Sequence, residues 1–500
     1  MNNLNVFPFI GYSLLASSTI TAKEAQPKPN IIFILSDDHA KSAISAYGGI
    51  NAKLAPTPNI DKIAEQGTIF NNMLCTNALS GPSRACLVTG KFSTTHGLFQ
   101  NNGGITFDNT QATVESILKA NGYTTSLFGK WHLNCMPTGF DYFKIHDSNG
   151  QQGNYWDPVF NLNGVKVTDK GYATDLTVQS GLKWLEEIRD KSKPFCMMIN
   201  FKAPHGPWQP DTKYLHLFDE VNFPYPATFN DDYKDRELTA GESQSTIKDL
   251  SKNDLKSAIP QGLSADSLKR WKYQQFIKNY LRCVRSVDDN VGNVLDYLKK
   301  NGLDKNTIVV YMGDQGFYLG EHGWYDKRWM YEESLQMACI IRDPSVSKPS
   351  PRVNALAMNI DITPTLLDYA GVKIPSDIQG ASLLPLLKDE KAATKTWRKA
   401  TYYQYFEYQK GQAHNIQPHY GVRTERYKLI HFYYDVDVWE FYDLKTDPTE
   451  LKNQYNNPEY KNEIAQLKLE IKNQQKQYGD DLPLEERRKL SDKYKKKHAE

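Results

Sequence analysis

The sequence predicts an α/β fold: a large, mostly parallel sheet sandwiched by helices, plus a small C-terminal antiparallel sheet with a helix. Three apolar runs, at residues 29–39, 194–205 and 306–316, are rich in branched side chains and lack polar/apolar alternation. Such runs are typical of parallel strands covered on both faces. Beyond about Leu387 the pattern changes to aromatic, strand-like runs separated by turns. We therefore expect a main α/β domain over 28–387 and a smaller α+β subdomain over 388–480.

Helical patterns occupy much of the chain between the apolar runs. Residues 59–67, 112–120 and 178–190 fit helices, and residues 124–128 fit a further strand. Residues 267–300 fit a long helix, because apolar side chains recur at alternating steps of four and three. A polar helix with Ile464, Leu467 and Ile471 on one side is expected in the C-terminal subdomain.

Other segments are expected to be exposed or structural. Residues 209–264, rich in Pro, Asp and Ser, predict a long surface insertion that borders the substrate pocket. Asp288 and Asp289 are expected on a solvated helix face, and Asp361 is expected to be structural. The lysine-rich stretch 481–500 is expected to be a solvated basic tail.

Charge and cysteine content exclude several classes of partner. The chain has 500 residues with 60 basic and 58 acidic side chains, so no nucleic-acid partner is implied. The six cysteines show no CxxC spacing, which argues against a zinc cluster and a disulfide framework. Cys196 and Cys283 lie in apolar contexts and are expected in the core.

The N-terminus resembles a signal peptide over residues 1–22. It has an apolar stretch at residues 6–16 and small residues before Lys23, although it lacks a basic start and Pro8 interrupts the apolar run. A disordered leader is the alternative. No other stretch approaches the ~20 apolar residues needed to span a bilayer. A periplasmic or secreted location is therefore expected.

Polar residues end the predicted strands. Asp37 and Asp38 end the first strand, Lys130 and His132 follow the strand at 124–128, His205 ends the next, and Asp314 and Gln315 end the last. Ligands of open α/β sheets bind at the carboxyl ends of the strands, so we expect these side chains to converge on one rim. The carboxylate and amide oxygens are hard ligands, which favour Ca²⁺ or Mg²⁺ over zinc.

The stretch SGPSRACLVTG, residues 80–90, predicts a short helix beside that rim. Pro82 favours a helix start and Gly90 a helix stop. Ser80 would then lie near free backbone N–H groups that attract an anion, with Arg84 one turn further on. An ordinary capped helix with an exposed serine is the alternative.

These motifs resemble the type I sulfatases of the alkaline-phosphatase-like superfamily. SGPSRACLVTG is similar to their signature, GKWH (129–132) to a second motif, and APHGPW (203–208) to a third; the resemblance covers about residues 29–453. It implies that Ser80 is oxidised to formylglycine by a transient, anaerobic radical-type maturing enzyme. It also implies a calcium ion, with magnesium as the alternative, held by Asp37, Asp38, Asp314, Gln315 and the residue-80 hydrate. Family members often have asparagine where Gln315 stands.

The resemblance also implies roles for the remaining motif residues. Arg84 would hold the hydrate, while Lys130 and Lys327 would bind the sulfate. A hydrate hydroxyl would attack sulfur. His205 would protonate the leaving sugar oxygen, and His132 would deprotonate the second hydroxyl as sulfate is expelled.

The strings DKRWMYEESL (326–335) and residues 419–444 most resemble bacterial carbohydrate sulfatases close to the N-acetylglucosamine-6-sulfatase group. This implies exo-acting 6-O-desulfation of a terminal N-acetylglucosamine in a host glycan, with His419 and Arg423 as sugar contacts, in a monomer or weak oligomer. The alternatives are a sulfatase for a 2-O-sulfated uronic acid or a galactose sulfate, a phosphoryl hydrolase of the same superfamily, and a non-catalytic glycan-binding protein.

Overall fold

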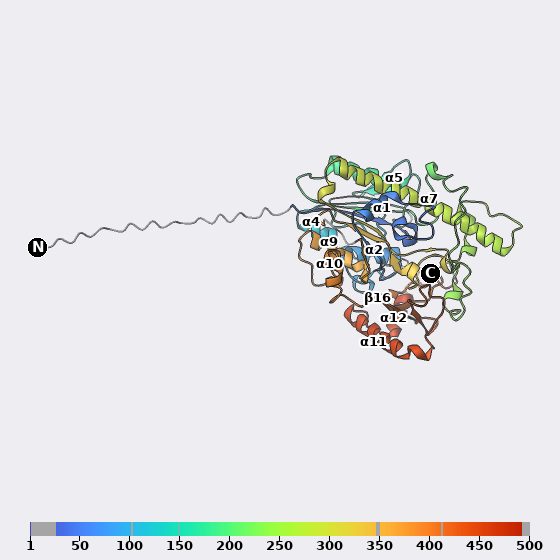
Figure 1. The fold of residues 1–500 in the computed structure, drawn as a ribbon. Helices are drawn as coiled ribbons and strands as arrows, with labels where there is room; N and C mark the ends of the chain where they lie inside the picture. The colour runs from blue at the N-terminus through green and yellow to red at the C-terminus, as the bar shows by residue number, and fades with distance from the viewer. Residues whose placement is uncertain (2–26, 102–103, 149, 347–350, 412–413, 493–500) are drawn as a thin grey trace.

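The computed structural model describes residue 1 and residues 27–101, 104–148, 150–346, 351–411 and 414–492. The expected signal peptide, residues 1–22, lies outside these ranges apart from Met1. Figure 1 shows one large body with the small C-terminal sheet and its helices beneath it.

The predicted large sheet is confirmed. Within the described ranges it has ten strands. In spatial order they are β14 (Arg352–Val353), β2 (Thr68–Phe70), β13 (Cys339–Arg342), β9 (Thr307–Gly313), β1 (Asn30–Ser36), β8 (Phe195–Phe201), β4 (Thr124–Gly129), β5 (Tyr142–His146), β6 (Val159–Leu162) and β7 (Val165–Thr168). The five central strands, β9 to β5, are parallel, whereas β13, β6 and β7 run antiparallel to their neighbours. Short pairs and bridges involve β3 (Met73–Leu74), β10 (Tyr318–Leu319), β11 (Tyr325–Asp326), β12 (Gln336–Met337) and β15 (Ala357–Met358).

Burial on both faces explains the unbroken apolar runs. Every residue of β1, β8 and β9 is buried. Along β1, Ile31, Phe33 and Leu35 belong to one core cluster, and Ile32 and Ile34 to the other. Ser36 is level with Phe201 of β8 and Gly313 of β9, so the central strands end together.

Helices cover both faces of the sheet (Figure 1). One layer contains α1 (Pro58–Glu65), α5 (Ala173–Lys183, continuing as a π-helical turn over Trp184–Ile188) and α7 (Ala265–Lys300), and α7 contacts both of the others. The other contains α2 (Ser80–Thr89), α4 (Val114–Ala120), α9 (Ile362–Tyr369) and α10 (Leu384–Ala393). Short helices are α3 (Ser93–His96), α6 (Lys252–Leu255) and α8 (Glu332–Leu335). No helix of the described chain is long and apolar enough to cross a membrane.

The small antiparallel sheet is also confirmed. Among the described residues it contains β16 (Ala400–Tyr405), β17 (His419–Thr424), β18 (Tyr427–Phe432) and β19 (Val438–Asp443), in that order. The helix α11 (Lys461–Gln477) packs on it through Ile464, Leu467 and Ile471, as the sequence predicts.

Two surface expectations are wrong. Asp288 is fully buried rather than solvated: its carboxylate accepts hydrogen bonds from the backbone N–H groups of Asn59 and Ile60 at the start of α1. Within the expected tail at 481–500, residues 484–492 form a helix, α12 (Leu484–Asp492), that buries Arg487 and Ser491, and residues 493–500 lie outside the described ranges. Arg487 is 1 % exposed and pairs with Asp480 at 3.0 Å. Its guanidinium also lies over the rings of Tyr420, Phe406 and Tyr433.

Candidate active site

Three buried aspartates meet where the central strands end. Asp37 and Asp38 follow β1, and Asp314 follows β9. One carboxylate oxygen from each lies within 4.8 Å of the others. The backbone N–H of Asp38 donates to Asp314 Oδ1 at 3.0 Å, and Asp38 has a left-handed φ of 58°. A non-glycine residue in this conformation is strained, and such residues concentrate at functional sites.

The helix α2 brings Ser80 and Arg84 to the same cluster. Ser80 Oγ donates to Asp37 Oδ1 at 3.0 Å. Arg84 Nε donates to Asp314 Oδ2 at 3.2 Å, and its Nη1 donates to the carbonyl of Lys130 at 2.9 Å. The helix ends as predicted at Gly90, whose φ of 68° is left-handed.

Cations balance the aspartates. Lys130 pairs with Asp37, Lys327 pairs with Asp38, and Arg84 pairs with Asp314 at 3.2 Å. Burial alone would raise the pKa of Asp37, but the charges of Lys130 and Arg84 hold it well below its usual range. Burial, against the pull of Lys327 and with the neighbouring charges of Asp37 and Asp314, raises the pKa of Asp38 to about 7. Three carboxylates this close repel one another, and a divalent cation would relieve that repulsion.

The donor set fits a hard cation. Gln315 Nε2 donates to Asp38, while Gln315 Oε1 is buried and makes no hydrogen bond within the described part of the chain. A buried amide oxygen without a partner is costly unless a ligand uses it. Four oxygen-bearing side chains, Asp37, Asp38, Asp314 and Gln315, can therefore hold Ca²⁺ or Mg²⁺, with no thiol or imidazole in the set.

Two histidines flank the aspartates. His205 follows β8, and its Nε2 lies 3.7 Å from Asp38 Oδ2. The hydroxyl of Tyr155 donates to the His205 carbonyl at 2.7 Å and holds that turn. His132 follows β4 with a φ of 60°. Burial is the main cause that lowers the pKa of both histidines well below the usual range, so both rings are neutral at neutral pH.

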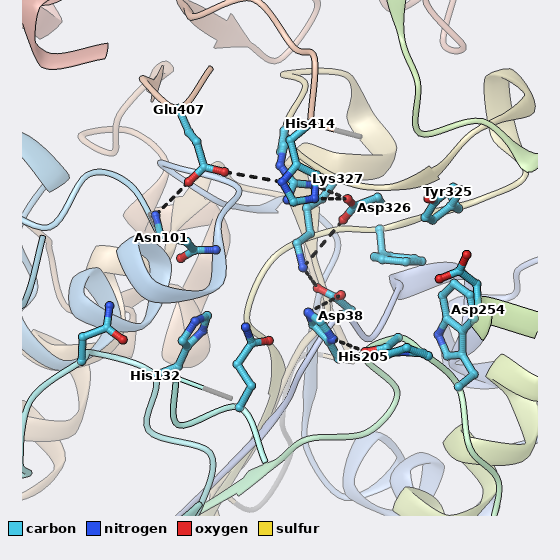
Figure 2. Close-up of a pocket in the computed structure, with 18 residues that line it drawn as sticks. Asp38, Asn101, His132, His205, Asp254, Tyr325, Asp326, Lys327, Glu407 and His414 are labelled. Atoms are coloured by element: carbon cyan, nitrogen blue, oxygen red, sulfur yellow. Dashed lines mark hydrogen bonds and ion pairs between the residues drawn. The ribbon is translucent and has the colours of Figure 1, made fainter. Parts of the chain in front are cut away.

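The site opens into a cavity of about 610 Å³, large enough for a small-molecule ligand. Asp38, His132, His205 and Lys327 line it (Figure 2). Asp37, Ser80, Asp314 and Gln315 are buried behind this lining. Asp254 also lines the cavity. It belongs to the insertion 209–264, which the sequence analysis expects to border the substrate pocket.

A second set of polar side chains lines the cavity, and none of them is among the site residues predicted from the sequence. Asp326 pairs with Arg328, and His414 Nε2 lies 3.6 Å from Asp326 Oδ2. Glu407 accepts from the backbone N–H of Asn101 at 3.0 Å and lies 3.8 Å from His414 Nδ1. Figure 2 places Asp326, Glu407 and His414 toward the end of the Lys327 side chain that lies away from Asp38. Asp326 and Arg328 flank Lys327 in the sequence, and this alternation of charge was the available signal.

The structure does not bring His419 or Arg423 to this cavity. His419 is fully buried in β17, where its ring lies between Tyr403 and Phe432. Arg423 is 5 % exposed, pairs with Glu332 at 3.1 Å, and lines a separate cavity. The expected sugar contacts are therefore misplaced: both residues lie in a strand, whereas the histidine that reaches the cavity, His414, lies in the preceding loop.

The fold and the buried acid–cation cluster define a hydrolase of the sulfatase type. Residues 29–372 match the family model "Sulfatase", and residues 320–477 match the model of the N-sulphoglucosamine sulphohydrolase C-terminal region. The chain belongs to the sulfatase family and is a sulfuric ester hydrolase.

Among individual relatives, an N-acetylglucosamine-6-O-sulfatase from Bacteroides thetaiotaomicron is 43 % identical, covering 94 % of this chain and 90 % of that protein. The human N-acetylglucosamine-6-sulfatase is 28 % identical, covering 78 % and 68 %. The structure of BT4656 in complex with its substrate D-glucosamine-2-N,6-O-disulfate superimposes with a TM-score of 0.87 at 43 % identity, covering 92 % of this chain and 99 % of that one.

Proposed function

We propose that this protein removes the 6-O-sulfate from a terminal N-acetylglucosamine 6-sulfate of a sulfated glycan. The observation that carries the proposal is the division of the cavity: one end holds cations and aspartates suited to a sulfate ester, and the other holds side chains suited to sugar hydroxyls. The 43 % identity to an N-acetylglucosamine-6-O-sulfatase supports the choice of sugar.

The reactive group proposed at the end of the cavity that holds the aspartates is formylglycine. A maturing enzyme would make it by oxidising Ser80. Asp37, Asp38, Asp314 and Gln315 would hold a calcium ion beside it. When bound, the ion supplies positive charge that favours an ionised hydroxyl and offsets negative charge on the sulfate oxygens. Ser80 already donates to Asp37, so the side chain at position 80 is next to the proposed ligands.

The chain's own cations would bind and orient the sulfate. Lys327 lines the cavity, and Lys130 is buried against Asp37. Fixed cations stabilise charge that develops on the sulfate oxygens as the S–O bond breaks. Arg84, held by Asp314 and the Lys130 carbonyl, would keep position 80 in place.

His205 is the proposed proton donor to the departing sugar oxygen. His132 is the proposed base that deprotonates the second hydroxyl at position 80 as sulfate is expelled. Both rings line the cavity. Burial keeps His205 neutral without substrate, and the charge of a bound sulfate ester would favour its protonated form. Its position 3.7 Å from Asp38 Oδ2 also favours the imidazolium.

Asp326, Arg328, Glu407 and His414 are the proposed contacts to the sugar hydroxyls. Carboxylates accept from hydroxyls, and hydrogen bonds to charged groups are worth about 1.5–3 kcal/mol each. The pairs among these side chains fix their directions before a sugar binds. A site arranged in this way discriminates between sugars by the position of their hydroxyls.

The proposed cellular setting is the periplasm or the outside of the cell, reached through residues 1–22. The proposed substrates are glycosaminoglycans or mucins.

The test is a substrate panel on the mature enzyme. Protein co-expressed with a formylglycine-generating maturase is incubated with N-acetylglucosamine 6-sulfate, galactose 6-sulfate and iduronate 2-sulfate, and released sulfate is measured by ion chromatography. We expect turnover of the first sugar and none by the matched Ser80→Ala variant. Mass spectrometry of the peptide containing residue 80 reports its oxidation. Hydrolysis of another sugar sulfate with N-acetylglucosamine 6-sulfate untouched would refute the assignment.

A further inference from the structure

Lys202 is a buried lysine that the proposed mechanism does not use. It follows β8, three residues before His205, and is 7 % exposed. Its Nζ lies over the ring of Tyr155, 5.3 Å from the centroid. Within the described ranges, its ammonium makes no hydrogen bond or ion pair with another side chain. The ammonium thus contacts an aromatic ring and no carboxylate of the described residues, so its N–H groups can donate hydrogen bonds to an anion.

The aspartates of the active site do not supply that charge by contact. Asp37, Asp38 and Asp314 are paired with Lys130, Lys327 and Arg84, so three negative groups already meet three positive ones. A divalent cation at the aspartates would leave the region with still more positive charge. Lys202 is therefore not needed to neutralise the aspartates of the catalytic site.

Lys202 lines a cavity of its own, of about 240 Å³. Lys256, from the insertion 209–264, and Asn154 and Gln209 line the same cavity. Pro207 lines both this cavity and the catalytic cavity, so the two are neighbours separated by the turn that carries His205. The smaller cavity thus combines two lysines with two amide side chains, and no carboxylate belongs to its described lining.

We propose that this cavity is a second oxyanion-binding site, which takes a sulfate or carboxylate group between Lys202 and Lys256. The amides of Asn154 and Gln209 can donate further hydrogen bonds to such a group. Burial lowers the pKa of Lys202, against the distant attraction of Asp37 and Asp38, and a bound anion would raise it again.

Two sources can provide this anion. One is inorganic sulfate, which the reaction releases next door. The other is an acidic group, a uronate or a further sulfate, on the sugar that follows the target residue in a glycan. The second source rests on the proposed function, and the first requires only the membership of the sulfatase family.

The direct test is a selenate soak, with sodium selenate as a sulfate analogue visible by its anomalous signal. Crystals of the full chain are soaked with Ser80 unmodified, so that no turnover occurs. We expect one selenium peak in the catalytic cavity and another within hydrogen-bond distance of Lys202 Nζ, with the second lost in Lys202→Met. The proposal is overturned if no selenium peak appears beside Lys202 Nζ, with or without a catalytic peak, or if that peak persists in Lys202→Met.

The kinetic test identifies the source. Lys256→Gln is compared with the matched control Lys252→Gln, which removes an exposed lysine four residues earlier that does not line the cavity. Substrates are N-acetylglucosamine 6-sulfate and a disaccharide in which this sugar is followed by a uronic acid. If the glycan provides the anion, Lys256→Gln lowers kcat/KM roughly three- to tenfold on the disaccharide alone. If free sulfate does, the variant weakens inhibition by added sulfate by a similar factor on both substrates.

Equal behaviour of Lys256→Gln and Lys252→Gln in both assays would reject Lys256 as part of the site. If the wild-type protein hydrolyses neither sugar, the proposed function fails. The selenate experiment then still decides whether the second site exists.

Discussion

Lys428 offers a sharp test of how the C-terminal sheet supports the catalytic segment. The residue is fully buried in β18. Its Nζ lies 2.9 Å from Glu332 Oε1 and 2.6 Å from Glu450 Oε1, and donates to the Met330 carbonyl at 2.7 Å. It therefore ties the small sheet to the stretch that begins with Asp326, Lys327 and Arg328. The change Lys428→Met keeps most of the side-chain volume and removes the charge.

The expected loss of unfolding free energy is about 3–5 kcal/mol, because removal of one partner leaves buried carboxylates uncompensated. The two glutamates differ in what remains to them. Glu332 keeps its 3.1 Å pair with Arg423, whereas Glu450 keeps the backbone N–H of Glu332 at 2.7 Å. Most of the cost should therefore come from Glu450. The double variant Lys428→Met/Glu450→Gln is expected to recover a large part of it.

The pH dependence follows from Glu450. Burial, opposed by Lys428 and assisted by Glu332, raises the pKa of Glu450 in the fold to about 7, above its unfolded value of about 4.3. Between these values the folded state holds the extra proton, so a raised carboxyl pKa lowers stability as pH rises. Glu450 is thus neutral in the fold at pH 5 and charged at pH 8. The loss caused by Lys428→Met should be smaller at pH 5 than at pH 8.

Urea unfolding followed by tryptophan fluorescence measures these differences at both pH values. The control is Lys489→Met, which breaks an exposed pair with Glu485 on α12 and should leave the midpoint unchanged. A Lys428→Met midpoint within error of the wild type at pH 8, or no recovery in the double variant, would refute the reasoning.

Three further outcomes are expected. Chelation with EDTA should lower the thermal unfolding midpoint of the wild type, and added calcium should restore it. The midpoint of Asp314→Asn should change with neither addition, and a response equal to that of the wild type would reject the aspartate site. His414→Ala should reduce kcat/KM at least tenfold in sulfate-release assays, since it removes a side chain that lines the cavity. His419→Phe, at a buried position away from the cavity, should keep kcat/KM within twofold of the wild type, and the reverse order would contradict the placement of both histidines. Gly90→Ala should cost about 1–3 kcal/mol in urea unfolding, because the residue has a φ of 68° and an added Cβ would lie 2.8 Å from Ile378 Cγ2, and an unchanged midpoint would contradict that geometry.

The convergence of the motif residues could be predicted because it follows from strand geometry. Asp37, His205 and Asp314 each end an unbroken apolar run, and parallel strands in register bring such ends together. No comparable rule places the loop residues. Glu407 and His414, from the described segments 406–411 and 414–418 between β16 and β17, reach the cavity through contacts with Asn101 and Asp326 far away in the chain.

His419 shows the same limit from the other side. In a strand, alternate residues face opposite sides, and the sequence does not tell which side is covered. The aromatic neighbours Tyr403 and Phe432, contributed by β16 and β18, enclose its ring. Asp288 was likewise assigned to solvent because its helical position gave no sign of α1, whose N-terminus it caps.

The sequence by itself determined which polar side chains lie at the end of each buried strand. It also determined that their oxygen atoms suit a hard cation rather than zinc. The unbroken apolar runs carry that information, since they mark strands that are buried on both faces. Only the tertiary structure decided which charges are paired and which are left over, including the surplus at Lys202 and the separation of His414 from His419. Pairing depends on distances between segments that are remote in the chain, and no local pattern encodes those distances.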